Sequence, residues 1–214
     1  MVVCPGRVPG KKAVRLEGRH MTAKPFDVTK GSLTIEIWAR QSGNAELPGV
    51  TARSGMFLAQ GDGYWSGLRL MLDSHTQRLQ FMVGRPKPLH ALGTSARQPV
   101  AEGTWNHLAA VWDGDQLKLY WNGLLAGTRE YDDDYTLPRG SLRIGYAGAG
   151  VGALKLDVDQ LAVFRRALSA EEILAHALDG EPISNQAAGR MVQAASTMVE
   201  KDWAAARKHY EAAL

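Results

Sequence analysis

The sequence predicts a mainly β protein, a two-sheet antiparallel sandwich that ends in an α-helical extension. Residues 32–40 alternate strictly between apolar and polar side chains, as in a strand with one buried face. The Asp-Gly pair at 113–114 and the Asn-Gly pair at 122–123 supply the positive-φ residues that tight hairpin turns need. After residue 167 the apolar spacing becomes helical.

Further strands are expected in short apolar stretches between turn residues. Their ranges are 13–18, 20–25, 56–60, 66–73, 78–84, 89–93, 106–122 (a hairpin), 124–129, 140–146 and 154–164. Residues 42–55 and most of 85–103 are rich in Gly, Pro and Ser, which predicts loops. Within 154–164 the apolar residues change parity, which predicts either a β-bulge near Asp159-Gln160 or a strand buried on both faces.

The C-terminal part is expected to be helical. Ser169 and Glu172 have capping-box spacing, and Gly180 followed by Pro182 ends that helix. An alanine-rich region from about 185 to 214 predicts a second helical unit. We therefore expect a flexible lead (1–9), a sandwich (10–180) and a helical tail (181–214).

Composition narrows the function classes. The chain has 214 residues, a net charge of +3 and no apolar run of the roughly 20 residues that cross a bilayer, so no membrane span is expected. Its beginning lacks signal-peptide features, so a signal is expected to be absent or already removed. Residues 1–30 are basic, which indicates either a solvated edge strand or contact with an acidic partner; nucleic acid is not expected. The single cysteine, Cys4, excludes an internal disulfide and a zinc cluster.

Three motifs resemble one family. They are Trp-Asn-His-Leu-Ala-Ala-Val-Trp-Asp-Gly with its partner strand (105–123), Leu-Thr-Ile-Glu-Ile-Trp (33–38), and the run from 157 to 173 that contains Arg-Ala-Leu-Ser. Together they resemble the laminin G-like, concanavalin A-like jelly-roll domains over roughly residues 10–180. Gln160 departs from the family, which commonly has Glu there. Separately, residues 202–214 resemble the second helix of a tetratricopeptide repeat; the alternative is a helical hairpin packed on the sandwich.

The resemblance implies a concanavalin A-like jelly roll and a non-catalytic recognition module that binds a glycan or a protein surface. The alternative is a scaffold domain of a larger repeat-containing protein with no small ligand, and a glycoside hydrolase is the third reading. Further domains of a longer parent chain are expected. The resemblance favours an extracellular or periplasmic location, and no cofactor is expected.

Candidate ligand-binding residues come from an aromatic loop and from side chains expected on an outer sheet face. They are Asp62, Tyr64, Trp65, Arg69 and Tyr120, with Trp38 as an extension of the same platform. The alternative is packing: Tyr64 and Trp65 within their loop, and Trp38, Trp105 and Trp112 in the core. His107 is expected to be a packed core or edge residue.

Two carboxylates are candidates for an ion site or for catalysis. Asp157 and Asp159 lie two residues apart and therefore share one strand face. The Glu-x-Asp-x-x-Glu string of the family's β-glucanases does not occur in the chain, so the pair has no third partner. Calcium is the alternative, with Asp113/Asp115 and residues 132–134 as further oxygen donors.

Overall fold

The computed structural model describes residues 2–17, 20–26, 32–45, 55–61, 67–73, 78–84, 89–93, 103–131, 140–145 and 153–178. The strands in these ranges are β1 (Val2–Pro5), β2 (Lys12–Glu17), β3 (Met21–Ala23), β4 (Leu33–Ala45), β5 (Gly55–Gln60), β6 (Gly67–Asp73), β7 (Arg78–Gly84), β8 (Leu89–Gly93), β9 (Trp105–Trp112), β10 (Gln116–Trp121), β11 (Leu124–Glu130), β12 (Leu142–Ile144) and β13 (Ala153–Phe164). The helix is α1 (Ala170–Ala177).

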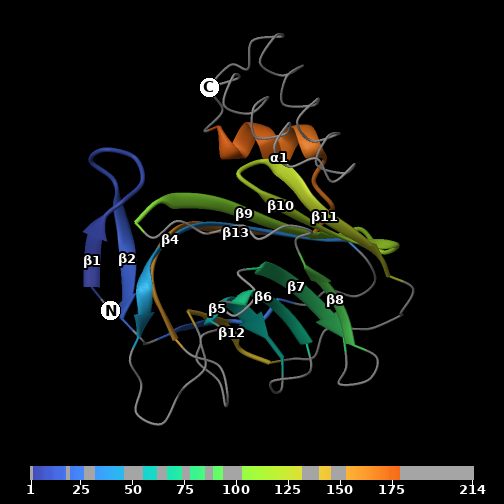
Figure 1. Cartoon of the computed structure of the whole chain (residues 1–214), viewed down its shortest axis with the longest axis horizontal. Helices are drawn as coiled ribbons and strands as arrows, with labels where there is room; N and C mark the ends of the chain where they lie inside the picture. Colours follow the sequence, from blue (N-terminus) through green and yellow to red (C-terminus); the bar gives the residue numbers. More distant parts are fainter. Residues whose placement is uncertain are drawn as a thin grey trace.

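The strands form two stacked sheets, as the sequence predicts (Figure 1). The seven-stranded sheet has the order β1-β2-β13-β4-β9-β10-β11, and the six-stranded sheet has the order β3-β12-β5-β6-β7-β8. Every pairing between the described strands is antiparallel. The two-sheet antiparallel jelly roll is thereby confirmed.

The hydrophobic core lies between the inner faces of the sheets. Alternate residues of β4 (Leu33, Ile35 and Ile37) are fully buried there against residues of the facing sheet such as Phe81. Trp112 also belongs to this core and packs on Tyr131 with ring centroids 5.0 Å apart. The core prediction for Trp112 is therefore confirmed, whereas Trp38 and Trp105 have the opposite parity and lie on the outer face.

The predicted turns and bulge are present. Asn122 and Gly123 both have positive φ, 50° and 81°, which is the geometry of a two-residue hairpin turn. In β13 the pairing with β4 shifts between Asp159 and Ala162, and Gln160 has a φ of 48°. This bulge turns both apolar sets of β13 toward the core, so Val158 and Val163 both pack on it.

Two boundaries differ from the sequence prediction. The lead segment predicted as flexible contains β1, which pairs with β2 from Val2 to Pro5 and buries Cys4 against the sheet. Strand β4 continues to Ala45, into a stretch predicted as a loop, because its end pairs with the start of β13. In both cases a partner strand supplies hydrogen bonds that the composition of the segment itself does not reveal.

Helix α1 packs on the outer face of the seven-stranded sheet (Figure 1). Ser169 and Glu172 form the predicted capping box. Ile173 of α1 joins Tyr120 and Ala109 of the sheet in one buried cluster. The second helical region predicted beyond residue 180 lies outside the described residues. Within the described chain, no helix has the length and apolar character needed to cross a membrane.

Candidate functional site

Charged and aromatic side chains gather on the outer face of the seven-stranded sheet, in two neighbouring cross-strand rows. The first row crosses β2, β13, β4 and β9 through Arg15, Asp157, Arg40 and Trp105. The second row crosses β13, β4 and β9 through Asp159, Trp38 and His107. We call the group formed by Arg7, Arg15, Trp38, Arg40, Trp105, Asp157 and Asp159 the arginine–tryptophan surface.

Asp157 lies at the centre of this surface, fully buried between two arginines. Strand β13 runs between β2 and β4, so Arg15 and Arg40 reach the same carboxylate from opposite sides. Arg15 donates through Nε to Oδ1 at 2.7 Å and through Nη2 to Oδ2 at 3.0 Å. Arg40 donates through Nε and Nη2 to Oδ2 at 3.0 and 2.6 Å. One carboxylate therefore fixes the position of two guanidinium groups.

The electrostatics of this cluster keep Asp157 ionised. Burial by itself raises the pKa of a carboxyl group, because the charged form loses its hydration. Here the hydrogen bonds and charges of Arg15 and Arg40 outweigh burial, and the net effect lowers the pKa of Asp157 below its ordinary value. The buried Cys4 thiol has a raised pKa, first because of burial and then because of the nearby Asp157 charge. Cys4 is therefore not an activated thiol.

Two guanidinium groups lie over the indole rings of the surface. The Cζ of Arg7 is 4.1 Å from the ring centroid of Trp38, and that of Arg40 is 4.8 Å from the ring centroid of Trp105. These distances are within the range of cation–π attraction. Both indoles are only partly buried.

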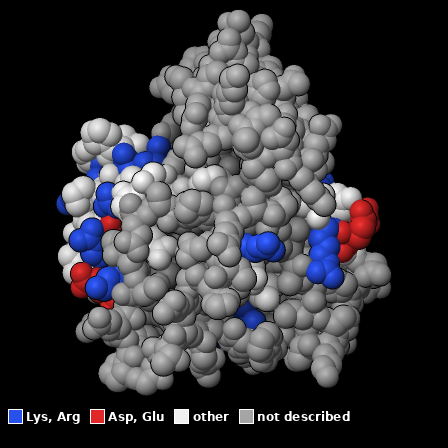
Figure 2. Space-filling model, viewed as in Figure 1, with Lys and Arg blue, Asp and Glu red and all other residues white. Residues whose placement is uncertain are grey.

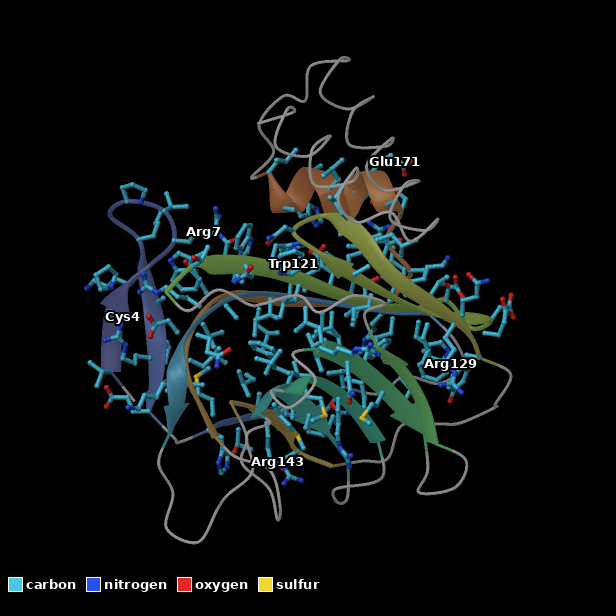
Figure 3. All side chains as sticks on the ribbon, viewed as in Figure 1. Cys4, Arg7, Trp121, Arg129, Arg143 and Glu171 are labelled. Atoms are coloured by element: carbon cyan, nitrogen blue, oxygen red, sulfur yellow. The ribbon has the colours of Figure 1, made fainter. Side chains whose placement is uncertain are left out.

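Arg7 comes from the connection between β1 and β2 and is held there by its backbone. Its N–H donates to Oδ2 of Asp159 at 3.1 Å. A Cβ on the neighbouring Gly6 would lie 3.0 Å from the same oxygen, so glycine permits this close approach. In Figure 3 the labelled Arg7 projects over the outer face of the sheet, on the side where α1 also lies.

A second polar cluster links the sheet to α1. Glu36 is buried beside the arginine–tryptophan surface; its Oε2 lies 2.8 Å from Nδ1 of His176, and its Oε1 lies 3.7 Å from Nε2 of His107. Burial raises the pKa of Glu36, and the hydrogen bond with His176 partly opposes this. His107 is buried and packs on Trp38 with ring centroids 5.2 Å apart. His107 therefore has a packing role, as the sequence predicts.

The two predicted binding residues that the structure describes, Arg69 and Tyr120, lie on different sheets. Asp62, Tyr64 and Trp65 lie outside the described residues. Arg69 is buried on the outer face of the other, six-stranded sheet, between Ala59 and Met82. The expectation that Arg69 extends one platform with Trp38 is therefore wrong, since they belong to opposite faces of the sandwich.

Tyr120 does have the predicted outward orientation, in register with Ala109 and Glu36. Its side chain is nevertheless only 5% exposed, because α1 packs over it. Burial raises its pKa to about 12, with smaller contributions from Glu171 and Asp113. The helix thus removes Tyr120 from the open part of the face, which local alternation could not predict.

The sequence interpretation assigned none of Arg7, Arg15, Arg40 and Trp105 to a binding site, and Arg7 and Arg15 entered it only as part of the basic stretch 1–30. A usable signal was present for Arg40 and Trp105, because alternation along β4 and β9 gives their parity directly. Arg7 and Arg15 reach the surface only because β2 pairs with β13.

The geometry does not fit a calcium site at Asp157 and Asp159. Calcium takes six to eight oxygen ligands, whereas both oxygens of Asp157 already accept hydrogen bonds from cations. Asp113 is likewise engaged, with its Oδ2 2.7 Å from Nζ of Lys118. Over the described part of the chain, no three His, Cys, Asp or Glu side chains converge as metal ligands. Residues 132–134, also expected as donors, lie outside the described ranges.

Solved structures share the fold at low sequence identity. The binding domain of Paraclostridial Mosquitocidal Protein 1 superposes with a TM-score of 0.68 at 14% identity, covering 84% of this chain and 45% of that one. Domain 4 of AbnA, an extracellular arabinanase from Geobacillus stearothermophilus solved with arabinotriose, gives 0.62 at 19%, covering 82% and 80%. The binding domain of botulinum neurotoxin DC, solved with rat synaptotagmin II, gives 0.63 at 12%, covering 85% and 46%.

Sequence relatives include pappalysin-1 of Mus musculus and of Homo sapiens, at 24% and 23% identity over 130 residues. The match covers 56% of this chain but only 8% of each relative. The family model described as "Concanavalin A-like lectin/glucanases superfamily" matches residues 16–174. It ends before the tail and so gives no support to the tetratricopeptide resemblance there. Because this model covers more than half of the sequence, the chain belongs to the concanavalin A-like lectin/glucanase superfamily.

Proposed function

We propose that this protein is a non-catalytic recognition module that binds a glycan at the arginine–tryptophan surface. The observation that carries the proposal is the pair of partly exposed indoles, Trp38 and Trp105, on adjacent strands with arginines fixed beside them. Saccharides combine apolar C–H faces with hydroxyl groups, and therefore suit sites with aromatic rings next to fixed polar groups.

The chemistry of Asp157 supports the non-catalytic part of the proposal. A retaining or inverting glycosidase needs one protonated carboxyl group as general acid. Asp157 has a lowered pKa and donates nothing, since its oxygens accept four hydrogen bonds from Arg15 and Arg40. Its role is to position the two arginines.

Two solved domains of similar fold were determined with bound ligands. One is a domain of an arabinanase solved with arabinotriose, and another is a toxin binding domain solved in complex with rat synaptotagmin II. A shared fold therefore allows either class of ligand. The aromatic and polar composition of the surface favours the glycan.

A glycan array followed by calorimetric titration of any hit tests the proposal. Trp38→Ala should weaken binding of that hit at least tenfold, because it removes both the ring and the support for Arg7. Leu125→Ala is the control, since it truncates a partly buried apolar side chain near α1, in the cluster with Tyr120. Failure of every saccharide to bind, or equal binding by Trp38→Ala and wild type, would contradict the proposal.

A further inference from the structure

We propose that the arginine–tryptophan surface selects acidic saccharides, whose carboxylate or sulfate groups bind at the edges of Arg7 and Arg40. This inference rests on the proposed glycan function and specifies its ligand class. It begins from what already occupies the indoles. A guanidinium group lies over each of Trp38 and Trp105, with its Cζ 4.1 and 4.8 Å from the ring centroid.

A guanidinium stacked on an aromatic ring keeps its N–H groups in a plane parallel to the ring. Those donors point sideways, where they match the two oxygens of a carboxylate or sulfate. A neutral sugar shares each ring with a guanidinium group, whereas an anionic group also binds the guanidinium itself. The arrangement therefore favours an acidic ligand over a neutral one of the same shape.

The central carboxylate fixes the donors in advance. Arg40 and Arg15 use Nε and Nη2 for Asp157. The printed contacts with Asp157 use only one edge of each guanidinium, so the Nη1 groups take no part in holding the carboxylate. Since less side-chain freedom is lost when an anion binds to positioned donors, this arrangement favours affinity.

The charge around the arginine–tryptophan surface is positive, as attraction of an acidic ligand requires. The arginine–tryptophan surface contains three arginines (Arg7, Arg15 and Arg40) and two aspartates, which gives these residues a formal charge of +1. Residues 2–17, which form the β1–β2 hairpin, carry four Lys or Arg against a single Glu. Figure 2 shows these basic side chains gathered over the hairpin at one side of the molecule. Such a field attracts polyanions and weakens with salt.

Two pairs of matched ligands test the inference on the whole chain. Galacturonan oligomers are compared with their neutral methyl esters, and dextran sulfate is compared with dextran. We expect each acidic member to bind at least tenfold more tightly than its neutral partner. Preference confined to the galacturonan pair would identify carboxylate as the recognised group, and preference confined to the dextran pair would identify sulfate.

Substitutions of Arg7 test whether the preference for acidic ligands arises at the arginine–tryptophan surface. Arg7→Gln should reduce affinity for the acidic ligand about tenfold while leaving the weak binding of the neutral ligand unchanged. Arg7→Lys should recover only part of the loss, because an ammonium lacks the planar pair of donors. Arg129→Gln is the charge-matched control; Arg129 lies on β11, at the opposite end of the sheet (Figure 3).

The outcomes separate this inference from the proposed function. Equal affinity for acidic and neutral partners, with loss on Trp38→Ala, would overturn the acidic preference and leave glycan recognition standing. Equal effects of Arg7→Gln and Arg129→Gln would show non-specific attraction to the basic chain and also overturn it. No binding by any of the four ligands or by an arrayed saccharide would contradict both.

Discussion

Replacement of Asp157 by asparagine tests the electrostatic centre of the surface. The substitution keeps the size of the side chain but removes the charge that accepts four hydrogen bonds from Arg15 and Arg40. Loss of one partner from a fully buried ion pair costs about 3–5 kcal/mol. Arg15 and Arg40 keep side-chain exposures of 37% and 23%, so water relieves part of this cost. We expect a loss of about 2–4 kcal/mol, equivalent to roughly 4–16 °C in melting temperature.

The contribution of Asp157 to stability depends on pH. Asp157 has a lowered pKa in the folded protein, so its ionisation stabilises the fold at every pH above the ordinary carboxyl value of about 4. As the pH falls below that value and through the lower folded-state pKa, the stabilisation disappears. The difference in unfolding free energy between wild type and Asp157→Asn should therefore stay constant from pH 5 to 8 and shrink below about pH 4.

Urea unfolding followed by tryptophan fluorescence, repeated across this pH range, measures both effects. Asp115→Asn is the matched control, because Asp115 is exposed in a turn and should change stability by less than about 0.5 kcal/mol. A loss of stability in Asp157→Asn no larger than in the control would refute the role of the buried carboxylate. A difference in unfolding free energy between wild type and Asp157→Asn that widens on acidification would refute it as well.

Three further substitutions test local features by thermal unfolding. Gly123→Ala should cost about 1–3 kcal/mol, because Gly123 has φ +81° and an added Cβ would lie 2.7 Å from Cδ1 of Leu174; an unchanged melting temperature would refute this. Gln160→Gly should stabilise the protein by about 0.5–1 kcal/mol by relieving left-handed backbone at the bulge, and a loss of stability would count against it. Ser169→Ala should cost about 1 kcal/mol through loss of the cap bond to Glu172, with Ser169→Asp, which also caps, as the variant that should retain stability.

Local patterns were sufficient for most of the fold. Alternation gave the inner face of β4, and Asn122-Gly123 gave the hairpin turn. The parity change in β13 gave the bulge at Gln160. Strand β1 was missed because Val-Val-Cys-Pro is too short to show a period, and its strand character depends on pairing with β2.

The candidate site was harder to predict from the sequence than the fold. The alternation of β4 placed Trp38 outward, but family packing favoured the core for Trp38 and Trp105; the structure agrees with the alternation. The contact of Arg15 with Asp157 joins residues 142 positions apart, and it exists only because β13 lies beside β2. Covering of Tyr120 by α1 is also a tertiary event. Parity is a local property, whereas the neighbours of an outward side chain are not.

Asp157 also separates two explanations of binding to an acidic ligand. Asp157→Asn raises the net positive charge of the surface by one, so attraction by charge alone predicts tighter binding. If positioned arginines are what the ligand recognises, loss of the carboxylate releases Arg40 and binding becomes weaker. We expect at least a fivefold loss of affinity for galacturonan oligomers, measured by calorimetry at a temperature where the variant is fully folded. An increase in affinity would show that the net field, and not the geometry built around Asp157, recognises the acid.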